Sequence, residues 1–213
     1  MKSVFSKSVP APAQQQLRKL FPKGDAAVID ALASAGPALA KAGILDNLFR
    51  LSMFVAQFGH ETRGLRDLEE DLDYSAERLM VVWPSRFPTL AAAQPFAHNA
   101  ETLAERAYGK RMGNIRPGDG WTFRGRGGGV TGREAYQEVG RIMGQPFEAH
   151  PELVATPAGA VTSAIGVWLW KNLSPSADRE DVATNTRLLN GGQIGLTARR
   201  TLYGLAKVLL HVA

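Results

Sequence analysis

The hydrophobic positions between residues 46 and 62 are spread around nearly the whole circumference of a helix. The apolar side chains in this stretch are Leu48, Phe49, Leu51, Met53, Phe54, Val55 and Phe58. A helix that is apolar on all sides is buried, whereas a surface helix carries a single apolar stripe. The pattern therefore predicts a buried central helix over 46–62, and Gly64 marks its exit.

A narrower stripe is present near the carboxyl end. Leu202, Leu205, Leu209 and Val212 recur at i, i+3 and i+7 spacing within 196–212, which predicts a helix with one core-facing side. Other helices are predicted from their start and stop residues. Asp25 and Ser75 are suited to cap helix N-termini, and Pro22, Gly43 and Pro84 end their segments. These further predicted helices cover 14–21, 25–42, 75–82, 89–108, 133–143, 157–172 and 179–189.

Residues 109–132 break the helical pattern, because nine of these 24 residues are glycine. We expect a loop or a short hairpin here, the single region of the chain that predicts β structure. No Lys-Ser or Lys-Thr follows the glycines, which excludes a nucleotide phosphate loop. A plain cluster of turns, an arginine–glycine nucleic-acid segment using Trp121 and Phe123, and a sugar-binding wall with an aromatic platform all remain open.

The chain reads as one mostly helical, two-lobed domain over 14–213, with a glycine-rich wall along a cleft and a flexible lead-in over 1–13. Its 213 residues are 45% hydrophobic and 21% charged, as in a soluble globular protein. There is no apolar run long enough to span a membrane, and no recognisable export signal. We therefore expect the protein to be made in the cytoplasm.

Cysteine is absent, which excludes disulfides, thiolate metal sites and cysteine nucleophiles. The four histidines, at 60, 98, 150 and 211, form no pair at metal-ligand spacing, so no metal site is expected. The net charge of +5 suggests an anionic partner such as nucleic acid, a membrane surface or a cell-wall polymer.

Two carboxylates in unlike environments stand around the end of the central helix. Glu61 ends this apolar helix, and Glu70 lies nine positions later among Glu69, Asp71 and Asp73. Nine residues of helix would separate them by about 13 Å, so the chain must turn, and Gly64 permits the turn. Burial would raise the pKa of Glu61 and suit it to donate a proton, whereas a solvated Glu70 would suit a base. Glu69 is a rival for the base, and plain capping or solvation would explain both acids without any function.

A third polar site lies at 186–192, where Asn190 precedes two glycines, with Arg199 and Tyr203 on the helix beyond. Alone, this pattern is typical of a helix C-cap and turn. However, six blocks occur together and in order, and with them the chain resembles glycoside hydrolase family 19, the chitinase-like group, above all its short phage and prophage lysins. The blocks are 54–62, 70–75, 108–114, 118–126, 167–170 and 190–203, and the likeness spans roughly 17–210.

The resemblance implies a mainly α, lysozyme-like fold and an inverting mechanism on β-1,4-linked N-acetylated amino sugars. It makes Glu61 the general acid, Glu70 the general base and Thr131 the residue that holds the attacking water. Within the matched blocks, substrate contacts are expected of His60, Tyr74, Trp121, Arg126, Asn190 and Arg199. No metal or organic cofactor is implied.

The chain departs from the family pattern at two places. Residues 127–130 read Gly-Gly-Gly-Val, one residue shorter than usual and without the family's glutamine. This change should remove a sugar contact and loosen the wall, since glycine is ordered at a greater entropic cost. Arg63 replaces a usually small residue and adds a positive charge near Glu61, which would oppose the acid role unless Arg63 points away.

These observations together predict a phage-type endolysin that hydrolyses the glycan strands of peptidoglycan, as a monomer without stable membrane insertion. It would wait in the cytoplasm and act on the wall after release. A chitinase on the same scaffold is the nearest alternative, and a non-catalytic wall-binding module is an alternative of another class. A basic nucleic-acid binder using 116–133 is the least favoured, so no nucleic-acid partner is expected.

Overall fold

The computed structural model describes residues 8–211 of the chain, and almost all of its regular structure is helical. The elements in chain order are α1 (Gln14–Leu20), α2 (Ala26–Ser34), α3 (Gly36–Lys41), η1 (Ile44–Asp46), α4 (Leu48–Glu61), α5 (Ala76–Val82), α6 (Leu90–Ala93), η2 (Gln94–Phe96), α7 (Ala100–Tyr108), α8 (Asp119–Thr122), α9 (Arg133–Met143), η3 (Pro151–Ala155), α10 (Pro157–Trp170), α11 (Ser174–Asp178), α12 (Val182–Asn190) and α13 (Leu196–His211). Within 8–211 the β structure amounts to two isolated bridges, Glu69–Arg126 and Arg126–Val130.

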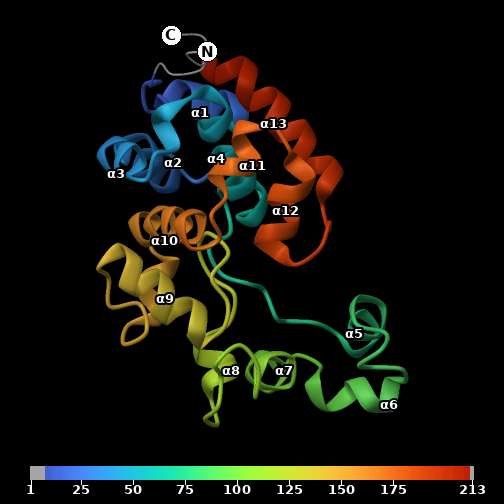
Figure 1. Ribbon diagram of the computed structural model, residues 1–213. Helices are drawn as coiled ribbons and strands as arrows, with labels where there is room; N and C mark the ends of the chain where they lie inside the picture. The colour runs from blue at the N-terminus through green and yellow to red at the C-terminus, as the bar shows by residue number, and fades with distance from the viewer. Residues whose placement is uncertain (1–7, 212–213) are drawn as a thin grey trace.

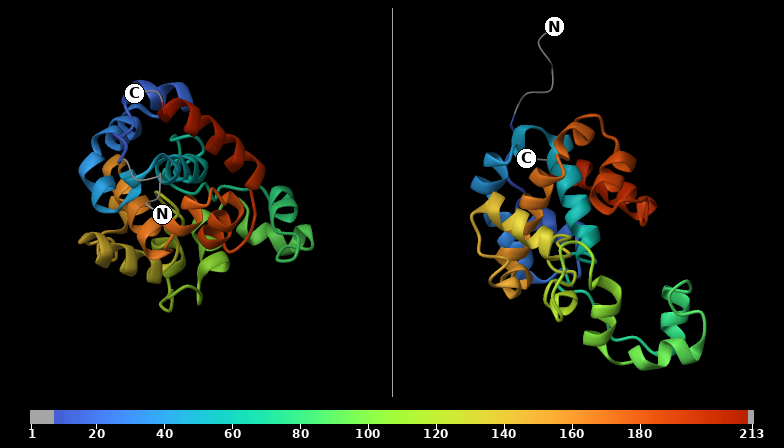
Figure 2. Two further views of the ribbon diagram at one scale, coloured as in Figure 1. Left: turned by 45° about the horizontal axis from the view of Figure 1, so that its top comes forward. Right: turned by 60° about the horizontal axis from the view of Figure 1, so that its bottom comes forward.

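The helices form a large body and a smaller arm. Helices α1 to α4 and α9 to α13 make up the body, and α5, α6 and α7 extend away from it (Figure 1). The right-hand view of Figure 2 shows the arm most clearly, connected through the segment after α4 and through α8. The predicted two-lobed, mainly α fold is confirmed, because the arm and the body have separate hydrophobic clusters.

Helix α4 is the buried centre of the body, as its all-round apolar pattern predicts. Every residue from Leu51 to Gly59 is buried, and α4 packs along α13 and against α11. The side chain of Asn47 caps its N-terminus by accepting a hydrogen bond from the Arg50 amide at 2.9 Å. The helix thereby holds its last residue, Glu61, on a rigid support.

The turn after α4 is tighter than a single glycine would require. Arg63, Gly64 and Leu65 all have positive φ, at 48°, 82° and 61°, although two of them are not glycine. Left-handed backbone costs energy in such residues and persists where the surroundings enforce it. Here the Thr62 hydroxyl accepts from the Leu65 amide at 3.2 Å, and the Leu65 carbonyl accepts from the Asp25 amide at 2.8 Å. The predicted turn at Gly64 is confirmed, but it involves three residues.

The predicted stripe on the last helix is confirmed only at Leu202 and Leu209, which pack against the core, and is wrong at Leu205. The buried residues of α13 are Arg199, Tyr203, Ala206 and Leu210, whereas Leu205 is 49% exposed and Leu202 and Leu209 are half-buried. Val212 lies outside the described residues. The helix is rotated because Arg199 is buried among its own polar partners at the end of α4, which hydrophobic periodicity does not register.

Two predicted helices are interrupted, a third begins later than predicted, and one helix is missing from the predictions. The helix over 25–42 breaks at Ala35, ahead of Pro37 at the start of α3. The stretch 89–108 divides into α6, η2 and α7. The Asn99 side chain caps α7 by accepting a hydrogen bond from the Thr102 amide at 3.2 Å. The stretch 179–189 begins late, because Asp181 caps α12. The short helix α8 lies inside the glycine-rich segment, where we expected a loop or hairpin.

Residues 8–13 form no helix, and the Val9 amide donates to the Leu45 carbonyl at 2.8 Å. Residues 1–7 of the predicted lead-in lie outside the described residues. No helix within 8–211 has the length and apolar character needed to cross a membrane.

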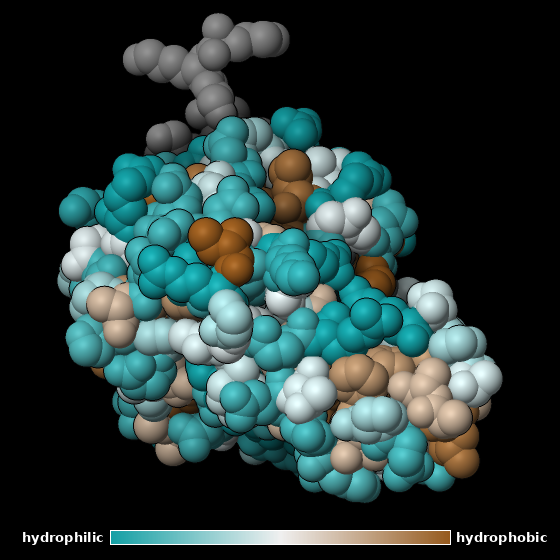
Figure 3. All heavy atoms as spheres, turned by 90° about the horizontal axis from the view of Figure 1, so that it is seen from below, coloured by the Kyte–Doolittle hydropathy of each residue, from teal (hydrophilic) through white to brown (hydrophobic). Residues whose placement is uncertain are grey.

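Seen from below, the surface is largely hydrophilic, with apolar residues gathered toward the end of the arm (Figure 3). Val81 and Leu90 are among the exposed apolar side chains there.

Candidate active site

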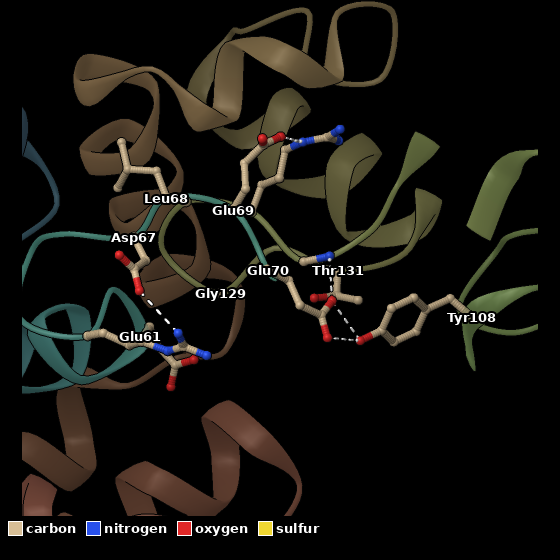
Figure 4. Close-up of a pocket in the computed structure, with 12 residues that line it drawn as sticks. Glu61, Asp67, Leu68, Glu69, Glu70, Tyr108, Gly129 and Thr131 are labelled. Atoms are coloured by element: carbon tan, nitrogen blue, oxygen red, sulfur yellow. Dashed lines mark hydrogen bonds and ion pairs between the residues drawn. The ribbon is translucent and has the colours of Figure 1, made fainter. Parts of the chain in front are cut away.

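One pocket brings the two predicted acids together between the body and the glycine-rich wall. Its lining includes Glu61 from the end of α4, Glu70 from the following segment, and Thr131, with Tyr108 from the end of α7. In Figure 4 the two glutamates face the same space, and Gly129 lies between them. The sequence placed these residues far apart in the chain, and the turn at 63–65 makes the convergence possible.

Glu61 is held by a buried cation. The Arg199 guanidinium, 2% exposed, donates hydrogen bonds to Oε1 of Glu61 and to Oε1 of Gln57. Gln57 lies one helical turn before Glu61 and donates from Nε2 to the Thr186 hydroxyl at 3.2 Å. A continuous polar chain therefore runs from α12 through α4 and α13 to the carboxylate, which fixes its orientation.

Glu70 is held by neutral donors. The Tyr108 hydroxyl lies 2.6 Å from Oε1 and 2.8 Å from Oε2 of Glu70, and the Gly125 amide donates to Oε2 at 3.4 Å. The backbone is fixed as well, because the Glu70 amide donates to the Gly125 carbonyl at 3.0 Å. Burial raises the pKa of Glu70, and the Tyr108 hydrogen bond, the Gly125 amide and the Arg124 charge oppose that rise.

The environments of the two acids differ from those predicted, although both residues are half-buried. Glu61 was expected to be the desolvated carboxyl and Glu70 the solvated one. Instead, the Glu61 side chain is 20% exposed and paired with Arg199, and burial against Tyr108 and Gly125 makes Glu70 the desolvated group. The reason is that Glu61 leaves the helix end toward the cleft, whereas the chain around Glu70 runs against the glycine-rich wall.

Glu69 points away from this pair. Its Oε1 accepts from Arg126 Nε at 2.6 Å and from Arg124 at 3.1 Å. In Figure 4 its carboxylate lies on the opposite side of the chain from that of Glu70. Arg126 is itself buried, and it also donates to the Thr122 carbonyl at 2.6 Å. Arg126 was predicted to bind substrate; although it lines the pocket, its guanidinium is engaged in holding the wall together.

Glycine is required at 127 and 128 for lack of space, and Gly129 has a left-handed backbone conformation. A Cβ on Gly128 would lie 2.3 Å from the Ala164 Cβ, and one on Gly127 would lie 2.6 Å from the Val154 carbonyl oxygen. Both residues are buried, and the Gly128 amide donates to the Ser163 hydroxyl at 3.3 Å. Gly129, at φ 95°, faces the Glu61 side chain. The shortened loop is thus tied closely to α10, contrary to the looseness we expected.

Thr131 lies on the Glu70 side of the pocket (Figure 4). If Gly125 carried a Cβ, that atom would lie 3.4 Å from the Thr131 hydroxyl and 3.0 Å from Oε2 of Glu70. This glycine therefore leaves open the space that the two oxygens share.

The aromatic platform predicted at Trp121 is occupied by the protein itself. The Arg124 guanidinium lies 3.7 Å from the centre of the Trp121 ring, and the residues lining the pocket do not include Trp121. Tyr74 packs against Trp83, with ring centres 5.7 Å apart. Burial, followed by the charge of Glu70, raises the pKa of Tyr74. Tyr74 is not among the residues that line the pocket.

His60 and Asn190 line an adjoining hollow together with Glu61 and Arg199. Burial and the nearby Arg199 charge lower the pKa of His60. Arg63, whose charge was expected to disturb Glu61, pairs with Asp67 at 3.2 Å and is 62% exposed. Within residues 8–211, no three His, Cys, Asp or Glu side chains are arranged to hold a metal ion.

Three residues of the site were not among the predicted ones. Gln57 is a polar residue inside an apolar helix, and because buried polar groups need partners, it could have indicated a buried network. Tyr108 opens a block that matched the family, yet nothing in its spacing connects it to Glu70. Arg124 was read only as part of the glycine-rich run.

Known proteins similar to this chain share its fold and part of its sequence. A "Glycosyl hydrolase family 19 domain-containing protein" from Haemophilus influenzae is 34% identical over 188 residues, which are 87% of this chain and 90% of that protein. Chitinase C from Streptomyces griseus HUT6037 is similar in structure, with a TM-score of 0.58 and 19% identity over 96% of this chain and 95% of that one. A bacterial family 19 chitinase gives a TM-score of 0.53 at 19% identity, over 94% and 95% of the two chains. No protein-family model matches the sequence.

Proposed function

Because this chain belongs to glycosyl hydrolase family 19 and is a glycoside hydrolase, we propose that it is a lysin that cleaves the β-1,4 bonds of peptidoglycan glycan strands with inversion. The observation that carries the proposal is the convergence of Glu61 and Glu70 on one pocket. Inverting glycosidases use one carboxyl group as acid and one carboxylate as base on opposite sides of the scissile bond.

In the proposed reaction, protonated Glu61 gives its proton to the glycosidic oxygen as the bond to the anomeric carbon breaks. Its position at the rigid end of α4 suits this role, and Arg199 holds Oε1 so that the other carboxyl oxygen is presented to the cleft. Once the proton has left, the guanidinium stabilises the resulting carboxylate. A proton from bulk water restores the acid for the next turnover.

Glu70 takes a proton from the attacking water, whose oxygen forms the new bond to the anomeric carbon, and releases that proton to bulk water before the next turnover. Thr131, on the same side of the pocket, is the residue proposed to hold that water. A base must be ionised, and burial works against this for Glu70. The Tyr108 hydroxyl, bonded to both carboxylate oxygens, stabilises the ionised form and orients it.

The choice of peptidoglycan rests on charge. The net charge of +5 suits an anionic wall polymer better than neutral chitin. Chitin is the second candidate, because the structurally similar proteins reported above are chitinases and because both polymers contain β-1,4-linked N-acetylglucosamine. In either case the enzyme is expected to need no cofactor.

Reducing ends released from purified peptidoglycan and from chitin oligomers test the substrate. We expect the wild-type enzyme to release reducing ends from peptidoglycan and Glu61→Gln to release none. Release from chitin alone would show that the protein is a chitinase. Release from neither polymer, with retained binding to the wall, would indicate a non-catalytic wall-binding module. Mass spectrometry of the fragments identifies the sugar at each new reducing end. NMR of the first product anomer tests inversion, and a retained β-anomer would contradict it.

A further inference from the structure

The groove containing the two glutamates continues well past Glu61. Next to the catalytic pocket is a hollow that shares Glu61 and Arg63 with it. A third hollow follows, bordered by Lys23, and it shares Arg63, Arg66 and Leu202 with the second. Because consecutive hollows share lining residues, they adjoin one another from Glu70 to Lys23, and Arg63 borders all three of them. We call the three adjoining hollows together the groove.

The charge of the groove changes along its length. The catalytic pocket is lined by four acids, Glu61, Asp67, Glu69 and Glu70, and by two cations, Arg63 and Arg126, so acids outnumber cations there. The far hollow is lined by three cations, Lys23, Arg63 and Arg66, and by no acid. We call these three side chains the basic extension. An anionic group on a bound polymer is therefore repelled at one end of the groove and attracted at the other.

Two cations of the basic extension are available to a ligand. Within residues 8–211, neither Lys23 nor Arg66 has an acidic partner. Arg66 donates from Nε to the Arg63 carbonyl at 2.8 Å, which fixes its stem while its terminal nitrogens make no hydrogen bond in the same part of the chain. Leu20, Phe21 and Leu202 provide an apolar floor beside the charges.

Arg63 is placed by the backbone at the junction of the three hollows. The left-handed turn at 63–65 directs the chain there, at a cost in conformational energy. Its ion pair with Asp67 is 3.2 Å long, and the two side chains are 62% and 43% exposed. Exposed pairs of this kind are weak, so a ligand carboxylate can replace Asp67 as the partner.

We propose that the basic extension binds the carboxylates of the substituent that distinguishes peptidoglycan from chitin, and so makes the enzyme prefer peptidoglycan. Every second sugar of a peptidoglycan strand carries a lactyl group, which ends in a carboxylate or continues into a peptide with carboxylates of its own. Chitin has neither. This inference rests on the proposed function, because it names the part of that substrate recognised beside the scissile bond.

Charge reversal at the two unpaired cations tests the proposal. Lys23→Glu and Arg66→Glu, singly and together, are assayed for kcat/KM on three preparations of glycan strands. One carries intact peptides, one has been stripped by an amidase to leave lactyl carboxylates, and one has been stripped and then amidated to remove the charge. We expect each reversal to lower kcat/KM on charged strands by about fivefold, as for loss of a surface ion pair, and to leave the neutral strands within about twofold. Added salt should shrink the difference.

Lys41→Glu on α3 is the matched control, because it changes the net charge equally at an exposed position outside the groove. Loss confined to peptide-bearing strands would identify the carboxylates of the peptide as the ligand, and loss confined to the stripped, charged strands would identify the free lactyl carboxylate. Loss on both charged preparations would show that the basic extension binds either carboxylate. Equal loss on neutral strands, equal loss in Lys41→Glu, or no loss at all would overturn the proposal. If the wild-type enzyme cleaves none of the strands, the proposed function itself fails, so the two failures are distinguishable.

Discussion

The two glutamates of the cleft are held by different kinds of structure. Glu61 ends a buried helix, and a buried arginine on another helix fixes its carboxylate. Glu70 lies on an irregular segment, and a phenol and a backbone amide fix its carboxylate. Glu61 thus has the charged partner, and Glu70 is the acid whose pKa is raised by burial. The comparison teaches that the partners of a carboxyl group are set by neighbours reached through the fold and not by its context in the chain.

The largest effect is expected when the proton donor is removed. Glu61→Gln should lower kcat by about 10³-fold, within the usual range for general acid–base catalysis, while the fold survives because glutamine can still accept from Arg199. Far-ultraviolet circular dichroism and turnover on peptidoglycan measure the two outcomes. Glu101→Gln, at an exposed position of α7, serves as the control, and a loss of less than tenfold in Glu61→Gln would contradict the acid role.

A large loss of stability is expected on the Glu61 side when its cation is removed. Arg199→Ala takes away a guanidinium that is 2% exposed and leaves Gln57 and Glu61 without it. Breaking a buried pair from one side costs about 3 kcal/mol or more, which urea denaturation will measure. By contrast, Arg141→Ala removes an ion pair whose arginine is 69% exposed and should cost well under about 1 kcal/mol. Similar losses in the two variants would mean that Arg199 does not act as a buried anchor.

On the Glu70 side, the expected effect is a displaced pH profile. The groups that act on Glu70 include the Tyr108 hydroxyl, the Gly125 amide and the Arg124 charge, all of which favour the ionised form; Glu61 and Asp67 line the same pocket. Without the phenol in Tyr108→Phe, the pKa of Glu70 rises further. The base is then protonated sooner on acidification, so the acidic limb of kcat/KM moves to higher pH.

The control for this prediction is another phenol–carboxylate pair. The Tyr203 hydroxyl donates to Glu180 at 3.0 Å, and neither residue lines the pocket. Tyr203→Phe should leave the acidic limb in place. We expect Tyr108→Phe to lose about tenfold in activity at acidic pH, as for a hydrogen bond to a charged group, and less at alkaline pH. An unmoved limb would show that Tyr108 only fills space.

The smallest effect is a gain of stability when the base is neutralised. A carboxyl whose folded pKa is raised contributes most stability below its unfolded value of about 4.5, and this contribution is lost as the pH rises through the folded pKa. Glu70→Gln should therefore unfold at a higher temperature than the wild type at neutral pH, and at a similar temperature below pH 4.5. A lower melting temperature at neutral pH would show that the burial of Glu70 is not costly.

Much of the fold could be predicted from the sequence, because local rules determine it. Continuous apolar character identified α4, and Asp25 and Ser75 cap α2 and α5 as expected. The face of α13 could not be predicted, since Arg199 is buried for the sake of partners on other helices. The breaks near Pro37 and Asn99 follow from proline and capping chemistry inside the predicted ranges, whose bounds were taken from start and stop residues at the two ends alone.

Some residues of the pocket could be predicted from the sequence, but their arrangement could not. Glu61, Glu70 and Thr131 share a pocket, yet their surroundings depend on contacts across the chain, such as that of Tyr108 with Glu70. For the same reason the prediction that Trp121 forms a sugar platform could not be checked from the sequence, because the Arg124 guanidinium that covers its ring is placed there by the fold. Spacing shows which residues are present, and only the fold shows what each of them faces.

The turnover of Glu70→Gln and Glu69→Gln, measured side by side on the same glycan strands, tests the pairing of Glu61 with Glu70 most directly. The two acids are adjacent in sequence, but Glu70 faces the pocket with Tyr108 and Glu69 is bound to Arg126 and Arg124. We predict that Glu70→Gln loses about 10³-fold in kcat and that Glu69→Gln loses less than about tenfold. Equal losses in the two variants, or a greater loss in Glu69→Gln, would contradict the account.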